Sequence, residues 1–415
     1  MVLKVNVGAL EVSFKNNWNK PIHRWYHFHA GCSSEFPEKI IDLLQIDKNC
    51  TILDPFAGSG TILISAKERE IHSVGFDLNP FYIFLAGVKT YWEFDMEYLF
   101  EFMNNFMVDV KNLFNKKVIC SCEDKNGVKV DNIPQYIWRY FNPEELEELS
   151  IIKKKVSEIK SEHIREFLLF ALASILIEVS KVHYVGETIV FDREPKKSIS
   201  VYDAYVQKVR MMYSDLKAKQ KIINRGNVMV KKGDIRDLLN LIPNKTVDHV
   251  ITHPPYLNNY NYLLHDRLPL YFLDYFKTPN DEKKMRDLII GSVTKNKISM
   301  EFSLDIPAMQ EIAKKIKATG DLERYKAFLE YFDSMSFFLE KLHDKIKRNG
   351  YCAMLVGNSY VRGVMVPLDV IIADVAERAG FEVLGISKVR DRGKGAFQHL
   401  YNGNLYESVV LLKIT

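Results

Sequence analysis

Short apolar runs alternate along most of the chain with longer segments of helical periodicity. The runs at 50–53 and 247–251 are apolar enough to be buried strands, and each leads directly into a tight turn. Between such runs, apolar residues recur every three or four positions, which is typical of helices that pack one face on a sheet. The strands expected from this pattern are 51–53, 72–76, 228–231, 247–251, 352–356, 381–389 and 408–414.

The order of these elements predicts the fold class. Helices separate the first six strands, and the last two strands form a hairpin. Alternating strands and helices of this kind give an α/β fold with a doubly wound, mainly parallel seven-stranded sheet. We expect the terminal hairpin to place one reversed strand at the edge of that sheet.

Residues 94–225 interrupt the alternation because their pattern is dominated by helical periodicity. Only 118–120 and 188–191 read as extended segments there. We therefore divide the chain into three parts. These are a first part of the core (1–93), a mostly helical insertion (94–225), and a second part of the core (226–415) with a helical segment at about 280–345.

Composition narrows the class of protein only slightly. The 415 residues are 47% hydrophobic, which suffices for a sizeable core, and they contain neither a run of about 18 apolar residues nor a signal-peptide pattern. We expect a soluble cytoplasmic protein with no membrane partner. The net charge of +4 is compatible with nucleic acid but does not indicate it.

Cysteines and basic clusters give weaker signals. Five cysteines are too few for a disulfide framework, and Cys120 with Cys122 lacks a second ligand pair, so no metal site is predicted. Basic residues that could contact phosphates, or could simply be solvated, form two clusters: Lys231, Lys232 and Arg236, and Lys388, Arg390, Arg392 and Lys394.

Four polar residues each stand where a predicted strand ends: Asp54, Asp77, Asp234 and His253. In a doubly wound sheet, ligands bind at the carboxyl ends of the strands. The shared placement therefore predicts one site formed from segments that lie far apart in the sequence.

Two turns follow these strand ends and differ in shape. The glycine-rich turn at 54–61, DPFAGSGT, lacks side chains at Gly58 and Gly60, so a ligand can lie against its backbone. The turn at 253–256, HPPY, is rigid and carries an aromatic ring. The first shape suits a nucleoside cofactor and the second suits a planar base. Together they indicate methylation of an exocyclic amino group with S-adenosylmethionine.

DPFAGSGT paired with HPPY resembles the amino-methyltransferases of nucleic acids, which make N4-methylcytosine or N6-methyladenine in DNA. Residues 27–29 and 36–41 are similar to the segment that precedes the glycine turn in those enzymes, and matching blocks cover 23–92, 228–275 and 350–415. His253 departs from the Ser, Asp or Asn that is usual there. The resemblance implies a Rossmann-like methyltransferase sheet, S-adenosyl-L-methionine as cofactor and double-stranded DNA as partner, and it allows for a cognate restriction endonuclease.

The resemblance also implies residue roles. Asp77 would accept hydrogen bonds from the cofactor's ribose or else cap a turn, and Asp234 would bind the adenine amino group or else cap a helix. Asp54 would bind the cofactor's ammonium group or brace the turn. The cofactor-binding residues implied are Asp54, Pro55, Phe56, Gly58, Gly60, Thr61, Asp77 and Asp234.

The catalytic residues implied are His253, Pro254, Pro255 and Tyr256. Acceptors at the His253 side chain and the Pro254 carbonyl would polarise the target amine, and Tyr256 would stack on a base flipped out of the duplex. A neutral imidazole can accept a hydrogen bond, so His253 can replace Ser or Asp. Alternatively, His253 marks a changed substrate or faces solvent. The loop at 258–262 suits base contacts, Asn358 is a further candidate, and Asp266 and Arg267 are expected to be structural.

Three functions remain open at this point. Thr252 before the turn and Tyr256 within it resemble the TSPPY of cytosine-N4 enzymes, which favours cytosine over adenine N6 as the target. RNA guanine-N2 methyltransferases have similar motifs, but usually with an N-terminal RNA-binding domain, whereas about 25 residues precede the motifs here. A catalytically inactive homologue that binds nucleic acid is the third. In each case the helical insertion is a candidate for contacting the nucleic acid.

Overall fold

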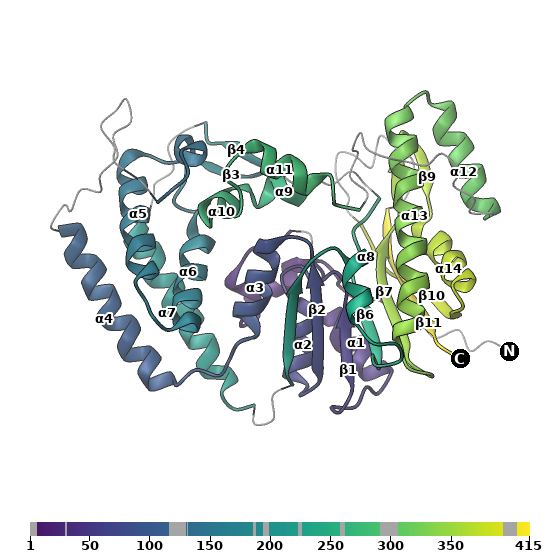
Figure 1. The fold of residues 1–415 in the computed structure, drawn as a ribbon, viewed down its shortest axis with the longest axis horizontal. Coiled ribbons are helices and arrows are strands. Elements are labelled where there is room, and N and C mark those ends of the chain that lie inside the picture. The colour runs from purple at the N-terminus through teal and green to yellow at the C-terminus, as the bar shows by residue number, and fades with distance from the viewer. Residues whose placement is uncertain are drawn as a thin grey trace.

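A seven-stranded sheet forms the centre of the protein in this computed structural model (Figure 1). The structure describes residues 6–29, 31–115, 130, 132–185, 188–193, 199–222, 226–257, 262–290, 306–392 and 405–415. The strands of the sheet are β1 (Thr51–Asp54), β2 (His72–Asp77), β5 (Val228–Lys232), β6 (His249–Thr252), β7 (Tyr351–Gly357), β10 (Glu382–Asp391) and β11 (Tyr406–Lys413).

The strand order is β10-β11-β7-β6-β1-β2-β5. Strands β7, β6, β1, β2 and β5 pair in parallel, and β11 runs antiparallel to both of its neighbours, β7 and β10. The sheet is therefore doubly wound and mainly parallel, of the Rossmann-like type, as the sequence predicted.

One detail of the predicted sheet is wrong. The reversed strand is not at the edge, because β11 pairs with β7 from Glu407 opposite Gly357 to Lys413 opposite Tyr351. The other strand of the hairpin, β10, pairs on the far side of β11 and forms the edge. A hairpin pattern in the sequence does not say which of its two strands pairs with the rest of a sheet.

Alternating residues of the central strands pack on opposite faces of the sheet. Ile52 and Ile251 pack with α1 (Glu35–Leu43) and α2 (Thr61–Glu68). Leu53 and Val250 pack on the opposite side. The helices on that side are α8 (Ile235–Leu238), α12 (Pro307–Ala318), α13 (Leu322–Lys345) and α14 (Leu368–Arg378).

The helices between 94 and 225 pack together on one side of the sheet (Figure 1). Between 94 and 225 the structure contains α4 (Met96–Asn115), η3 (Gln135–Tyr140), α5 (Pro143–Ser157), α6 (Glu162–Ile175) and α7 (Val201–Lys219). A hairpin of β3 (Val182–Val185) and β4 (Thr188–Phe191) joins them; the sequence predicted only its second strand. Residues 118–120, also expected to be extended, lie outside the described residues.

These helices share one hydrophobic core with segments on either side of them. The core includes Trp25, Phe81 and Trp92, and it extends to α3 (Pro80–Thr90), α9 (Tyr262–His265) and α10 (Arg267–Phe272). Asp215 of α7 also accepts hydrogen bonds from the Ile22 amide and the Trp25 indole, both at 3.0 Å. The helical part is thus packed directly on the chain segment that precedes the glycine turn.

The other short elements are η1 (Phe14–Asn19), η2 (His23–Trp25), η4 (Leu239–Leu241), α11 (Pro279–Arg286) and the hairpin of β8 (Ser359–Val361) with β9 (Val364–Val366). None of the helices that the structure describes is both long and apolar enough to cross a membrane.

Candidate active site

A pocket of about 400 Å³ opens at the carboxyl ends of β1, β2, β5 and β6. Residues of the N-terminal segment, the residues after α11, and side chains of β10 and β11 complete its walls. The predicted site residues that line it are Asp54, Pro55, Phe56, Gly58, Thr61, Asp77, Asp234, His253, Pro254, Pro255 and Tyr256. The structure therefore brings together eleven of the twelve residues predicted from the sequence, and Gly60 is the exception.

Gly60 is absent from the pocket lining, and packing accounts for a glycine at this position. It lies at the start of α2 with φ +82°, and a Cβ atom there would stand 3.1 Å from both Cα and Cβ of Ala86 in α3. Only glycine combines this backbone conformation with such close contact at little cost. The glycine turn is thus held against α3 by Gly60, while Gly58 faces the pocket.

We predict that Gly60→Ala lowers the free energy of unfolding by about 1–3 kcal/mol, because it adds backbone strain and a clash with Ala86. Gly87→Ala is the matched control, since Gly87 lies within α3 and a Cβ there would meet no atom within 4 Å. The control should be neutral or stabilising by up to about 1 kcal/mol. Urea denaturation measures both, and equal stability of the two variants would contradict the packing role.

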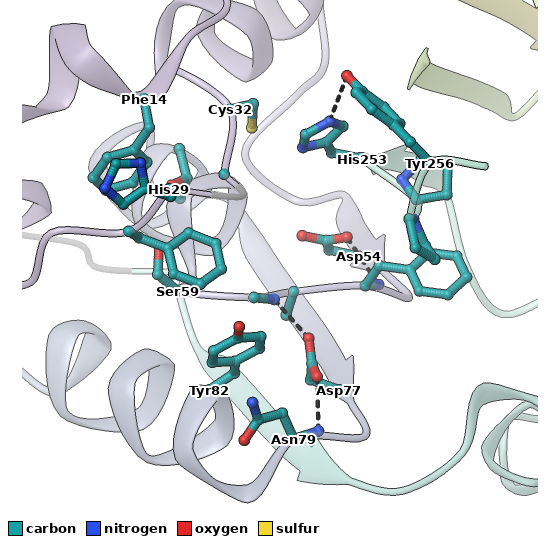
Figure 2. A pocket seen from close by; sticks show the side chains of 18 of the residues that line it. Phe14, His29, Cys32, Asp54, Ser59, Asp77, Asn79, Tyr82, His253 and Tyr256 are labelled. Atoms are coloured by element: carbon teal, nitrogen blue, oxygen red, sulfur yellow. Dashed lines mark hydrogen bonds between the residues drawn. The ribbon is translucent and has the colours of Figure 1, made fainter. Parts of the chain in front are cut away.

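Asp77 connects the end of β2 to the glycine turn. Its Oδ2 accepts from the Gly58 amide at 2.9 Å and its Oδ1 accepts from the Asn79 amide at 2.8 Å (Figure 2). Burial raises the pKa of this carboxyl to about 6. Asp77 thus shapes the turn, as one reading of the sequence expected, and it also lines the pocket.

Asp54 connects β1 to β6. Its Oδ1 accepts from the Thr252 hydroxyl at 2.9 Å and from the Phe56 amide at 3.2 Å, and the side chain is buried. Burial raises its pKa to about 7, and the nearby Asp77 adds to this effect. The pocket is therefore lined by two neighbouring carboxyl groups that repel each other when both are ionised. A bound cation would relieve this repulsion.

Asp234 caps α8, which is the alternative that the sequence left open. Its Oδ1 accepts from the Arg236 amide at 3.0 Å and from Arg236 Nε at 2.8 Å. Arg236 Nη2 is also paired with Asp234 Oδ2, so this member of the basic cluster is engaged within the protein. Asp234 nevertheless lines the pocket, with both of its carboxyl oxygens beside the Arg236 guanidinium.

The HPPY turn is held by side chains from two other elements. His253 is partly buried, and its Nε2 lies 2.8 Å from Tyr256 Oη (Figure 2). Tyr256 Oη donates to Glu407 of β11 at 3.0 Å, and the Tyr331 hydroxyl donates to the Pro255 carbonyl at 3.0 Å. Burial lowers the pKa of His253 to about 4, so the imidazole is neutral at neutral pH.

One face of Tyr256 is covered by a cation. The guanidinium carbon of Arg392 lies 5.1 Å from the ring centroid, and Arg392 Nη2 donates to the Asn358 carbonyl at 2.8 Å. Asn358 itself accepts from the Tyr406 amide at 2.8 Å and is absent from the pocket lining, so its contacts are structural.

Other pocket residues had a weak sequence signal or none. The 27–29 segment lines the pocket, which agrees with its similarity to the segment before the glycine turn in known enzymes. Glu407 and Arg390 also line it and pair with each other at 2.8 Å, and Arg390 pairs with Glu11 at 2.8 Å. Arg390 is therefore not available as an isolated phosphate contact, and Lys394 lies outside the described residues.

Residues just after the HPPY turn are partly outside the description. Residues 258–261 are not described, and neither is the side chain of Tyr262. Asp266 is buried and accepts from Tyr26 at 2.6 Å and from Tyr82 at 2.7 Å, which fits a structural role.

Across the described part of the chain, no three His, Cys, Asp or Glu side chains are grouped so as to hold a metal ion; Cys120 and Cys122 fall outside that part.

Comparisons with known proteins give one family match and several relatives. Residues 10–87 match the family of N6 and N4 methyltransferases that is described as DNA methylase. The Type II methyltransferase M.BsoBI of Geobacillus stearothermophilus is 24% identical over 448 residues, which cover 94% of this chain and 84% of that protein. The Type II methyltransferase M.MvaI of Kocuria varians is 22% identical over 399 residues, which cover 90% of this chain and 85% of that protein.

Two further similarities are local or weak. The Type II methyltransferase M.MjaII of Methanocaldococcus jannaschii is 33% identical over 108 residues, which are 26% of this chain and 19% of that protein. The rRNA methyltransferase aviRa of Streptomyces viridochromogenes has a TM-score of 0.28 at 9% identity, over 91% of this chain and 85% of that one. That score is too low to bear on function. The family match and the Type II relatives together support a DNA amino-methyltransferase.

Proposed function

We propose that this protein uses S-adenosylmethionine to methylate the exocyclic N4 amino group of cytosine in double-stranded DNA. One observation carries the proposal: the glycine turn, the carboxyl groups of the buried Asp54 and the partly buried Asp77, and the HPPY turn open into the same pocket. The first two features suit the cofactor and the third suits the base. The family match and the Type II relatives support DNA as the substrate and allow for a restriction endonuclease that acts on the same site.

The residues of the pocket fit this cofactor. Asp54 and Asp77 supply negative charge where a cationic amino acid group would be stabilised, and Asp77 is placed to accept from ribose hydroxyls. Ile235 and Ile289 give the same pocket an apolar wall that suits a purine ring. When bound, the cofactor supplies a methyl group on a positively charged sulfur.

We predict that cofactor affinity falls as pH drops from about 8 to about 5. The pKa values of about 7 for Asp54 and about 6 for Asp77 mean that each carboxyl group binds a proton within this range. A protonated carboxyl cannot pair with an ammonium group, so a cationic ligand must displace the proton. Each linked proton costs up to about tenfold in affinity per pH unit.

Titration calorimetry across this pH range measures that effect. Asp54→Asn should remove the step nearest pH 7, because an amide does not titrate there. An affinity that is independent of pH would show that neither carboxyl group faces the ligand's positive charge.

The HPPY turn supplies hydrogen-bond acceptors for the target amine. Its nitrogen is conjugated to the base and is therefore a poor nucleophile. Acceptance by the His253 side chain and the Pro254 carbonyl would favour a pyramidal nitrogen with an available lone pair. The neutral state of His253 at neutral pH is the state that can accept.

The choice of cytosine rests on the motif, not on a contact with the base. Thr252, which makes the motif similar to TSPPY, is fully buried and donates to Asp54, so it supports the cofactor side of the pocket. Digesting methylated DNA to nucleosides and weighing the product tests the assignment. N4-methylcytosine is expected, and N6-methyladenine would show that adenine is the target base. If RNA treated in the same way contained N2-methylguanine instead, the substrate would be RNA and not DNA. Cofactor binding without any product would indicate an inactive homologue.

We predict that bound DNA cross-links to the β3–β4 hairpin of the helical part. The Tyr184 ring in β3 stands 5.4 Å from His29, which lines the pocket, whereas Figure 1 places α4 at the far end of the helical part. Photo-cross-linkers placed at Val190 and, as a control, at Val108 of α4 would be compared, since both side chains are exposed. Adducts should form at Val190 and not at Val108. The reverse pattern, or cross-links confined to other regions, would remove the hairpin from the DNA-binding surface.

A further inference from the structure

Glu407 is a buried carboxylate that connects the last strand of the sheet to the HPPY turn. The residue is only 6% exposed. Its Oε2 accepts from Arg390 Nε at 2.8 Å, and its Oε1 accepts from Tyr256 Oη at 3.0 Å. Both oxygens of Glu407 therefore act as acceptors, one for a guanidinium N–H and one for a hydroxyl.

This contact fixes the direction of the next hydrogen bond. A tyrosine hydroxyl carries one proton, and here Glu407 receives it. His253 Nε2, 2.8 Å from the same oxygen, must therefore donate its own proton to Tyr256. In a neutral imidazole with the proton on Nε2, Nδ1 carries a free lone pair.

We infer that Glu407 is a positioning residue that, through Tyr256, holds His253 in the tautomer whose Nδ1 accepts a hydrogen bond from the target amine. This inference rests on the proposed function for its consequence in catalysis. Figure 2 shows the second ring nitrogen of His253 on the side of the ring away from Tyr256.

A histidine at position 253 requires a neighbour that fixes its tautomer. The oxygen of Ser, Asp or Asn can accept a hydrogen bond in one defined place. Histidine presents two nitrogens, of which only one accepts, so the wrong tautomer would direct an N–H at the amine. Without Glu407 as its acceptor, the Tyr256 hydroxyl can instead donate to His253 Nε2, and that donation moves the imidazole proton to Nδ1.

The tautomer can be measured directly by nitrogen NMR of the full-length protein labelled with ¹⁵N-histidine. The His253 signals are assigned from their loss in His253→Asn. The wild type should have the proton on Nε2, and Glu407→Met, which removes both oxygens at similar length, should shift the population toward Nδ1. Glu11→Gln is the control, because Glu11 pairs with the same Arg390 at 2.8 Å but does not reach Tyr256. A wild-type proton on Nδ1, or no shift in Glu407→Met, would overturn the inference.

Kinetics provide a second, independent readout. Glu407→Met should lower kcat for methyl transfer by about tenfold or more and leave cofactor affinity unchanged, since one acceptor is lost at the amine. In a His253→Asn background the same change should have little effect, because an amide oxygen accepts without a tautomer. An equal loss of kcat in both backgrounds would indicate a merely structural role. If the wild type transfers no methyl group to DNA, the proposed function fails, while the NMR result still decides the tautomer.

Discussion

Replacing Asp77 with alanine is expected to weaken S-adenosylmethionine binding by about ten- to a hundredfold. The carboxylate lies at the end of β2, lines the pocket and accepts from the Gly58 amide at 2.9 Å. Under the proposed function, its loss would remove acceptors for the ribose hydroxyls and would also loosen the glycine turn. Charge-assisted hydrogen bonds are worth about 1.5–3 kcal/mol each, which gives this range of affinity. Isothermal titration calorimetry at about pH 8, where the group is ionised, measures the loss.

The expected loss should depend on where the carboxylate stands in the sheet. Asp77→Asn keeps one acceptor oxygen and should fall between wild type and alanine. Asp248→Ala is a matched control, because Asp248 also accepts a hydrogen bond from a backbone amide, that of Thr51, at 2.9 Å. This bond lies at the start of β1, and Asp248 does not line the pocket. Unchanged affinity in Asp77→Ala, or an equal loss in Asp248→Ala, would remove Asp77 from the cofactor site.

The strands and their polar ends were predictable because both signals are local. A buried parallel strand favours adjacent apolar residues, and β1 has Ile52 and Leu53 while β6 has Val250 and Ile251. The residue after such a strand must lie at the carboxyl edge of the sheet, which is why the sequence placed Asp54, Asp77 and His253 together and the structure has all three lining one pocket. Topology alone brings them together, so no knowledge of side-chain packing was needed.

The sequence could not assign roles that depend on contacts between distant segments. Glu407 stands 151 residues from Tyr256, and only the pairing of β11 with β7 brings it to the HPPY turn. That pairing was itself mispredicted when the reversed strand was placed at the edge. The close contact between Gly60 and Ala86 could not be predicted either, because it depends on how α2 packs on α3.

Asp234 illustrates a different limit. An aspartate that follows a strand and precedes a helix can cap the helix or bind a ligand, and both uses favour the same residue at the same place. The structure contains the cap, yet the side chain still lines the pocket. A local pattern therefore cannot say whether such an aspartate caps the helix, binds a ligand or does both.

Replacing His253 is expected to change both the rate of methyl transfer and its dependence on pH. Burial lowers the pKa of His253 to about 4, and protonation would remove the one lone pair with which a neutral imidazole can accept a hydrogen bond. With saturating cofactor, kcat should therefore stay level from about pH 8 to about pH 5 and fall below that. Because kcat reports groups in the bound complex, this limb is distinct from the loss of cofactor affinity near the pKa values of Asp54 and Asp77.

Substitutions at 253 separate acceptance from titration. His253→Asn keeps an acceptor oxygen and should remain active without the acid limb, whereas His253→Ala should lower kcat by about ten- to a hundredfold, the value of a lost hydrogen bond of about 1–3 kcal/mol. Tyr256→Ala should cost about 1–3 kcal/mol of base stacking, and Tyr256→Phe should keep the stacking while losing the contacts to His253 and Glu407. The acid limb would have another origin if it persisted unchanged in His253→Asn. Full activity of His253→Ala would mean that the amine is polarised by the Pro254 carbonyl alone.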